Sequence, residues 1–315
     1  MNSPEPGSGS AGRRIGIVLN AQAGSASEDL EQRLQSIFRR LDVEPRIFVP
    51  SSADALGTTL REAMAESFDT IVAGGGDGTV NAVAGAIVGT ETRLGVLPLG
   101  TLNHFARDLG IPLDLDAAAE TIVRGSVAAV DAGEVNGNIF VNNSSLGLYP
   151  AMVRLRDSLR NTAGYGKWRA FVRASIGILL RFPRLRLELT PVGSSTIRCK
   201  TPLLFVGNNS YETGLTTLGT RTRLDGGALW IVLPAAASRW RMLMLLLAMM
   251  RGVAERADEL TTMTSPNLLV RSPKRRLRVA TDGEVITLKP PLRYRIRQKA
   301  LLVMVPSGNA VSDAD

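Results

Sequence analysis

The sequence contains very few of the side chains that form disulfides and common metal sites: one cysteine and one histidine among 315 residues. Cys199 has no second cysteine to pair with, so an internal disulfide is excluded and a reducing compartment such as the cytoplasm is expected. A single histidine, His104, excludes sites that need two or more histidines, including the common zinc enzymes. For His104 itself we expect a position in a loop or at a helix start, without a catalytic role.

Aromatic residues and long apolar runs are also scarce. Aromatics make up 5% of the chain, and without a run of stacking side chains nucleic acid is a weak candidate partner. The longest apolar run, Met242–Met250, is too short to span a bilayer, which takes about 20 residues. Helices are predicted over Tyr165–Phe182 and Trp240–Val253. For Trp240–Val253 we expect core packing, with the membrane interface as the alternative.

Charge is distributed unevenly along the chain, whose net charge is +8. Residues 13–130 carry 10 arginines and 15 acidic residues, which leaves 27 basic and 14 acidic residues for the rest. Such asymmetry indicates that the later part faces an anionic surface. An anionic membrane fits better than nucleic acid, and arginines that are merely solvated are the alternative.

The order of predicted elements indicates two domains between a disordered leader at 1–12 and a disordered tail at 307–315. Residues 13–130 alternate strands with helices, which is typical of a mostly parallel sheet. Strands are predicted at 14–19, 46–49, 70–72 and 93–97, and helices at 27–41, 53–66, from Thr79 to Gly89, up to Arg107, and at 114–124.

Residues 131–294 contain many short predicted strands, which favours a β-rich sandwich or barrel-like second domain. These strands are expected at 130–135, 138–142, 185–190, 198–206, 228–233, 267–270, 277–280 and 285–288. A last strand is predicted at 301–305 and could return to either domain. We assign residues from about 295 to 306 to the first, α/β domain.

The stretch Gly74-Gly-Gly-Asp-Gly-Thr79 follows a predicted buried strand and precedes a helix. Its glycines let the backbone approach a ligand closely, and the helix directs free N–H groups at the turn, as in phosphate sites. Asp77 would repel phosphate unless a cation lay between them, so the loop indicates a magnesium-nucleotide ligand. The alternative is a tight turn in which Asp77 only caps the helix. Asn20–Ser25 and Gly100–Asn103 also follow strands, and all three loops are expected at one edge of the sheet.

Two Asp-Gly turns in the second part have a structural and a chemical interpretation. Asp225, in Leu224-Asp-Gly-Gly227, forms either a simple turn or part of a cation site. Asp282-Gly-Glu284 lies between two predicted strands, where Asp-Gly is a strong hairpin signal. A carboxylate two residues further on, Glu284, is also what a base that deprotonates a hydroxyl requires.

Taken together, these motifs resemble the diacylglycerol kinase catalytic-domain family, which includes bacterial lipid kinases and the sphingosine and ceramide kinases. The resemblance runs from Arg14 to about Val305 and rests on Gly74–Asn81, Leu97–Asn103 with Phe105–Arg107, and Thr281–Glu284. It implies an α/β N-terminal lobe related to phosphofructokinase and NAD kinase, and a β-rich sandwich as C-terminal lobe. Differences from the family pattern are Ala21, Ala82, His104 and Leu224.

The resemblance also implies an activity: phosphorylation of a membrane-lipid hydroxyl with Mg-ATP as donor. It implies diacylglycerol or a related glycerolipid as acceptor, and ceramide or a long-chain base in second place. Glu284 matches the general base, with Asp282 beside it. The positions that match ATP contacts are Asn20, Ser51 (or Ser52), Gly75, Gly76, Asp77, Gly78, Thr79, Asn81, Gly100, Thr101 and Asn103. Asp225 matches a structural magnesium site that carbonyls near Thr222 and Gly227 would complete.

The expected setting is therefore cytoplasmic, with peripheral binding to an anionic membrane, no nucleic-acid partner, and a homodimer left open. NAD kinase shares the Gly-Gly-Asp-Gly loop and is the alternative enzyme. A nucleotide-binding regulator without acceptor activity is the non-enzymatic alternative.

Overall fold

The computed structural model describes residues 14–20, 25–52, 55–147, 184–211, 221, 223–234 and 260–308. The predicted leader, most of the predicted tail, Thr222 and the two helices predicted over 165–182 and 240–253 lie outside these residues. None of the helices in the described part is long and apolar enough to cross a bilayer.

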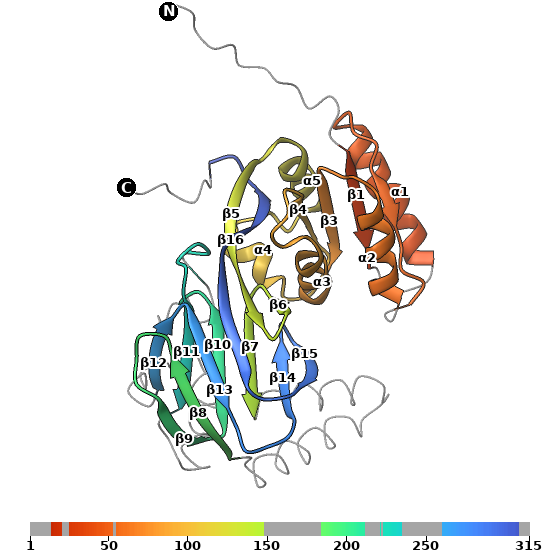
Figure 1. Cartoon of the computed structure of the whole chain (residues 1–315). Helices are drawn as coiled ribbons and strands as arrows, with labels where there is room; N and C mark the ends of the chain where they lie inside the picture. Colours follow the sequence, from red (N-terminus) through yellow and green to blue (C-terminus); the bar gives the residue numbers. More distant parts are fainter. Residues whose placement is uncertain are drawn as a thin grey trace, which may run out of the picture. The chain divides into compact units, whose positions relative to one another are not determined.

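The chain packs into two units, residues 1–129 with 301–315 and residues 130–300 (Figure 1). Unit 1 combines helices with a parallel sheet, and unit 2 is built from antiparallel strands. These are the two architectures that the sequence predicts, and the expected fold class is confirmed. Two strands, β5 (Ser126–Val135) and β16 (Leu292–Val305), contribute residues to both units.

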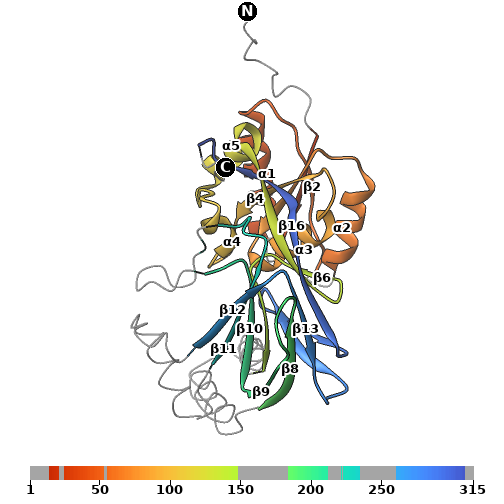
Figure 2. The same ribbon diagram turned by 60° about the vertical axis from the view of Figure 1, so that its left-hand side comes forward.

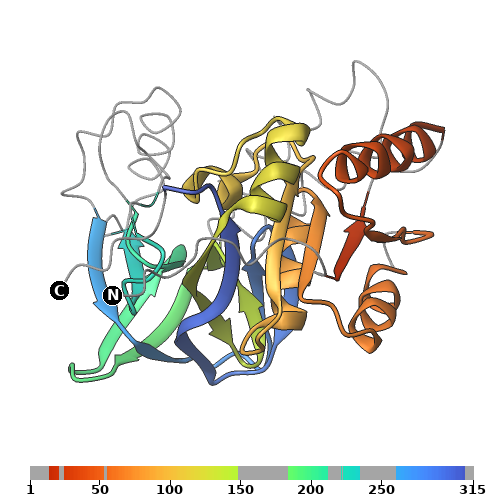
Figure 3. The same cartoon turned by 90° about the horizontal axis from the view of Figure 1, so that it is seen from above.

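Unit 1 alternates strands and helices in the order β1 (Ile15–Leu19), α1 (Ser25–Arg39), β2 (Arg46–Phe48), α2 (Leu56–Ala65), β3 (Thr70–Gly75), α3 (Asp77–Ile87), β4 (Arg93–Pro98), α4 (His104–Asp108) and α5 (Leu115–Arg124). Its sheet has the order β2-β1-β3-β4, followed by the last residues of β16, and every pair is parallel. Helices α1 and α2 lie on opposite sides of β1 (Figure 3). The side chain of Asp114 caps α5 by accepting the Ala117 N–H at 3.0 Å.

This strand order places three loops side by side. Strands β1, β3 and β4 are neighbours and parallel, so their carboxyl ends meet at one edge of the sheet. The loops that begin at Asn20, Gly76 and Leu99 leave the sheet at this edge. All residues of β1 and β3 are buried, which explains why both strands are almost entirely apolar or glycine.

Unit 2 is a sandwich of two antiparallel sheets (Figure 2). One sheet has the order β16-β13-β8-β9 and the other β12-β11-β10-β7-β14-β15, while β6 forms a hairpin with β5. The remaining bounds are β6 (Asn138–Phe140), β7 (Asn143–Gly147), β8 (Leu185–Pro191), β9 (Ile197–Thr201), β10 (Leu203–Asn208), β11 (Leu229–Pro234), β12 (Leu260–Ser265), β13 (Asn267–Arg271), β14 (Leu277–Thr281) and β15 (Glu284–Leu288).

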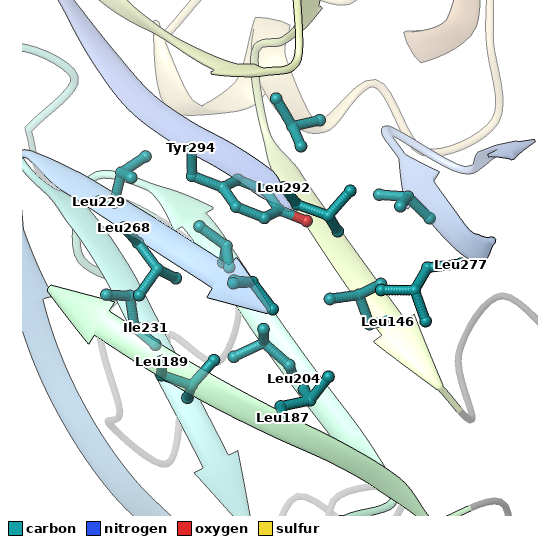
Figure 4. Close-up of a cluster of buried hydrophobic side chains, with 14 of the residues drawn as sticks. Leu146, Leu187, Leu189, Leu204, Leu229, Ile231, Leu268, Leu277, Leu292 and Tyr294 are labelled. Carbon is teal, nitrogen blue, oxygen red and sulfur yellow. The ribbon is translucent and has the colours of Figure 1, made fainter. Parts of the chain in front are cut away.

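The core of unit 2 lies between the two sheets. Leu187 and Leu189 of β8 and Leu268 of β13 pack with Leu204 of β10 and Ile231 of β11 (Figure 4). Along β8, residues alternate strictly between buried and less buried positions, because successive side chains of a strand point to opposite faces. Tyr294 of β16 is also fully buried, and its hydroxyl is satisfied by the Ser144 hydroxyl at 3.1 Å.

Three local predictions differ from the structure. The strand predicted over 198–206 is two strands, β9 and β10, separated at Pro202, whose nitrogen has no hydrogen to donate. The last strand extends back to Leu292, nine residues before the predicted start. Strands β7 and β12 are not predicted from the sequence, since their polar stretches, Asn-Ser-Ser-Leu-Gly and Leu-Thr-Thr-Met-Thr-Ser, lack an apolar run.

Candidate functional site

The glycine-rich loop joins β3 directly to α3. The helix begins at Asp77, two residues before the predicted start, and Gly76 is its N-cap. Asp77 is the first residue of the helix and not its N-cap, so the alternative in which Asp77 caps the helix is wrong. The N–H groups of Asp77 and Gly78 are in the first turn, where a helix provides no acceptor for them. The loop therefore offers free N–H groups and the positive end of the helix dipole to an anion.

Asp77 also has an unused acceptor. Its Oδ1 atom is buried and makes no hydrogen bond with any described residue. A buried carboxylate oxygen without a partner is costly, and native proteins usually satisfy such atoms with hydrogen bonds or ions. Carboxylate oxygen is a preferred ligand of Mg²⁺. The residues at this loop therefore fit a magnesium ion together with phosphate oxygens.

Asn20 and Gly75 fix the position of Thr79 at the start of α3. The Asn20 amide donates to the Thr79 hydroxyl at 3.1 Å, and the Asn20 backbone N–H donates to the Gly74 carbonyl at 2.8 Å. Thr79 is 4% exposed. A side chain at position 75 would collide with the Thr79 hydroxyl, so this position requires glycine. The first predicted loop is thus bonded to the second.

The third loop, after β4, lies against the glycine loop. A Cβ atom on Gly100 would lie 2.5 Å from the Gly76 Cα and 2.7 Å from Asn103 Oδ1. Asn103 has a left-handed backbone with φ of 49°. Its side chain accepts from the Gly100 N–H at 3.0 Å and donates to the carbonyls of Pro98 and Gly100. Asn103 therefore holds the loop in shape with its own side chain.

The other nucleotide-contact positions differ in accessibility. Ser51 and Thr101 are exposed, and Asn81 is half-buried one turn into α3. Unit 1 thus brings Asn20, the glycine loop and the Gly100–Asn103 loop into contact. Their assignment as nucleotide contacts stays a prediction.

The predicted Asp-Gly-Glu hairpin connects β14 to β15. Asp282 lies at its turn with φ of 46°, and its carboxylate accepts three backbone N–H groups, from Val141 at 2.7 Å and from Asn142 and Asn143 at 2.9 Å each. Burial raises the pKa of Asp282 to about 6, although these hydrogen bonds and the charge of Arg221 act in the opposite direction. The carboxylate therefore anchors the β6–β7 turn.

Glu284 follows on the same hairpin as the first residue of β15. Glu284 is exposed, but the protein around it removes enough water to raise the pKa of Glu284 above its ordinary value of 4.5. A carboxylate that is accessible and has a raised pKa is suited to accept a proton from an acceptor hydroxyl. The roles of Glu284 and Asp282 in catalysis stay predictions.

A buried polar cluster next to Asp282 is not apparent from the sequence. Arg221 is 4% exposed, and its guanidinium donates to the carbonyls of Val141 and Asn208 and to Asn142 Oδ1 at 2.7, 3.1 and 2.8 Å. It also lies over the Tyr211 ring, whose hydroxyl donates to the Asn142 carbonyl. These residues are up to 80 positions apart, so no local pattern could have indicated the cluster.

At the predicted structural metal site, Asp225 and Gly227 contact other protein groups. Asp225 forms a two-pronged ion pair with Arg223, at 3.1 and 3.3 Å. The Gly227 carbonyl accepts from Gln298, and its N–H donates to Asp131. Thr222 lies outside the described residues. Within the described ranges, three or more acidic, cysteine or histidine side chains are nowhere grouped to hold a metal. The metal site at Asp225, Thr222 and Gly227 stays a prediction.

Comparison with known proteins identifies the family to which the chain belongs. The diacylglycerol kinase catalytic domain family matches residues 14–135. A protein of Pseudomonas aeruginosa named "probable lipid kinase YegS-like" is 30% identical over 256 residues, which are 79% of this chain and 81% of that protein. The chain belongs to this family of lipid kinases.

Other relatives match over shorter stretches. A diacylglycerol kinase of Bacillus subtilis is 35% identical over 165 residues, 49% of this chain and 54% of the relative, so the match spans only about half of that protein. The match to the Pseudomonas protein covers more residues than the match to the Bacillus protein.

Solved structures share the fold. The crystal structure of a diacylglycerol kinase from Bacillus anthracis has a TM-score of 0.65 at 17% identity, over 93% of this chain and 97% of that one. An NAD kinase from Archaeoglobus fulgidus, solved in complex with ATP, has a TM-score of 0.52 at 12% identity, over 94% and 95%. At these identities the likeness shows the fold alone.

Proposed function

We propose that this protein is an ATP-dependent lipid kinase that phosphorylates a hydroxyl group of diacylglycerol or a related glycerolipid. The observation that carries the proposal is the buried, unpartnered Oδ1 of Asp77, in a phosphate-type loop of a chain that belongs to a lipid kinase family. A ceramide or long-chain base is the second acceptor class. The proposal places the protein in the cytoplasm, at the surface of an anionic membrane.

In this proposal the residues of unit 1 hold the nucleotide. The glycine loop and the first N–H groups of α3 bind the phosphates, and Asp77 provides an oxygen ligand for Mg²⁺. Bound Mg-ATP would supply the phosphoryl group together with a cation that neutralises its charge. Asn20 and Asn103 keep the surrounding loops in place through the hydrogen bonds described above.

Glu284 acts as the general base for the lipid acceptor. Its carboxylate takes the proton from the lipid hydroxyl as that oxygen attacks the phosphoryl group. The raised pKa of Glu284 makes it a stronger base than an ordinary carboxylate. Asp282 positions the hairpin that carries Glu284, because its own carboxylate is occupied by three backbone N–H groups.

An acceptor screen tests the function. The purified full chain is incubated with Mg-ATP labelled on the terminal phosphate and with diacylglycerol, ceramide, a long-chain base or NAD in neutral detergent micelles. We expect label in the diacylglycerol product. Label in NAD alone would establish the NAD kinase alternative, and ATP binding without turnover on any acceptor would establish the regulator alternative.

The role of Glu284 is tested by Glu284→Gln, with Glu91→Gln, on an exposed turn of unit 1, as the matched control. Loss of a general base typically lowers kcat by about 10²- to 10⁴-fold, while ATP affinity should stay unchanged. The wild-type rate should rise with pH through a pKa above that of an ordinary glutamate, and this rise should disappear in Glu284→Gln. Full activity of Glu284→Gln would remove Glu284 from the mechanism.

A further inference from the structure

The outer surface of one sheet of unit 2 is strongly basic. On β8, Leu185, Leu187 and Leu189 point into the core, so the residues between them point outward. The register pairs Arg186 with Lys200 and Glu188 with Arg198, and pairs of directly opposed residues share a face. On the other side of β8, Arg271 of β13 lies opposite Glu188. We call Arg186, Arg198, Lys200 and Arg271 the basic face.

Little negative charge balances this surface. Glu188 is the single acid among the outward residues of these three strands, and it is already held by Arg198 at 2.9 Å. Arg186, Lys200 and Arg271 have no ion-pair partner among the residues that the structure describes. The basic face continues into the exposed Lys274, Arg275 and Arg276, directly after β13.

The basic face also contains a hollow of about 550 Å³. Arg186, Arg198, Lys200 and Arg271 contribute cations to its lining, and Glu188 contributes the one acid. A lining with four cations and one acid suits the phosphate of an anionic phospholipid headgroup. The lining contains no aromatic side chain on which a nucleic-acid base could stack.

We propose that the basic face is the surface through which this protein docks onto anionic phospholipids. The inference rests on the proposed lipid kinase function in one respect: a kinase with a membrane-lipid acceptor needs a surface that holds it at the bilayer. Three cations without acidic partners among the described residues, on a broad sheet face, supply the attraction. Each lysine or arginine near an anionic bilayer strengthens binding by about fivefold, an effect that salt weakens.

Vesicle sedimentation tests the docking surface without requiring catalysis. The full chain is mixed with vesicles of phosphatidylcholine alone, or of phosphatidylcholine with phosphatidylglycerol, at low and at high salt. We expect binding only to the vesicles with phosphatidylglycerol, and weaker binding at high salt. The variant Arg186→Gln/Lys200→Gln/Arg271→Gln should bind these vesicles about a hundredfold more weakly, since it removes three charges.

The matched control is Arg39→Gln/Arg61→Gln/Arg124→Gln, which removes three exposed charges from unit 1. It should bind the vesicles like the wild type, and thermal unfolding should show that both variants are folded. Equal binding by the basic-face variant and the wild type would overturn the inference, and so would an equal loss in the control. Displacement by soluble glycerol 3-phosphate, or binding to duplex DNA in place of vesicles, would overturn it as well.

The kinase assay separates this inference from the proposed function. Turnover in neutral micelles together with unaltered vesicle binding by the basic-face variant would refute the docking surface alone. Vesicle binding that depends on the basic face, without turnover on any acceptor, would refute the kinase function and leave the docking surface in place.

Discussion

The contact between Gly76 and Gly100 makes a sharp prediction about backbone packing at the candidate site. In Gly100→Ala, the new methyl group would lie 2.5 Å from the Gly76 Cα and 2.7 Å from Asn103 Oδ1. Neither neighbour can move cheaply: the first is backbone at the N-cap of α3, and the second is bonded to the Gly100 N–H. One of the two loops must therefore shift.

The expected cost follows from these two clashes. Overpacking by one methyl group usually costs about 1–3 kcal/mol, and weakening the Asn103 hydrogen bond adds about 1 kcal/mol. We expect Gly100→Ala to lower the free energy of unfolding of unit 1 by about 2–4 kcal/mol. Urea unfolding followed by far-ultraviolet circular dichroism is the appropriate assay, and the fluorescence of Trp230 follows unit 2 separately.

Two further glycine-to-alanine variants complete the experiment. Gly57 lies on the exposed side of α2, and a methyl group there would have no neighbouring atom within 4 Å. Gly57→Ala should therefore leave the free energy of unfolding unchanged or raise it by up to about 1 kcal/mol. At Gly76 the nearest atom would be 3.4 Å away and φ is −88°. We expect Gly76→Ala to keep its stability but to lose ATP affinity, because it adds a methyl group to the glycine loop that we propose to hold the phosphates. Wild-type stability of Gly100→Ala would refute the reasoning.

Two other predictions concern hydrogen-bonded side chains. Burial raises the pKa of Asp282 from 3.8 to about 6, so the folded state binds the carboxyl proton of Asp282 more tightly than the unfolded state does. The difference in the free energy of unfolding between wild type and Asp282→Asn should therefore be largest below pH 3.8 and should decline as the pH rises to about 6. A difference that grows with pH in urea titrations would contradict this. Asn103→Ala should lower the free energy of unfolding by about 2–4 kcal/mol. Asn103→Gly should lower it by about 1 kcal/mol less, because glycine adopts the left-handed φ of 49° without strain. Equal unfolding midpoints for the two variants would show that backbone strain plays no part.

The sequence predicts most of the fold because local patterns determine most of these elements. Buried parallel strands such as β1 and β3 are continuous apolar runs, and Asp114 marks the start of α5 by its capping chemistry. Strand β7 escapes prediction because its pairing with β10 and β14, and not its composition, makes it a strand. For β16 a signal is present: Leu292, Tyr294 and Ile296 alternate with arginines, which is the two-residue period of a strand.

The candidate site is predictable where ligand binding constrains consecutive residues. A glycine loop between a strand and a helix can be recognised in one stretch, and Gly75 and Gly100 are indeed positions where a side chain would collide. The support of the hairpin cannot be recognised in this way. Arg221 and Asp282 meet the backbone of Val141–Asn143 only after unit 2 has folded, and neither lies near that turn in sequence.

Two of the three Asp-Gly motifs, at Asp77 and Asp282, look alike in sequence, but the structure gives them opposite chemistry. Asp77 keeps a buried oxygen without a hydrogen-bond partner among the described residues, so it has an acceptor available for a cation. Asp282 uses both oxygens to accept three backbone N–H groups. Asp77 is therefore the carboxylate suited to bind the metal, and Asp282 is suited to anchor the turn. Of the two carboxylates on the hairpin, Glu284 is the exposed one, and it is the one that we propose to accept the proton of the lipid hydroxyl.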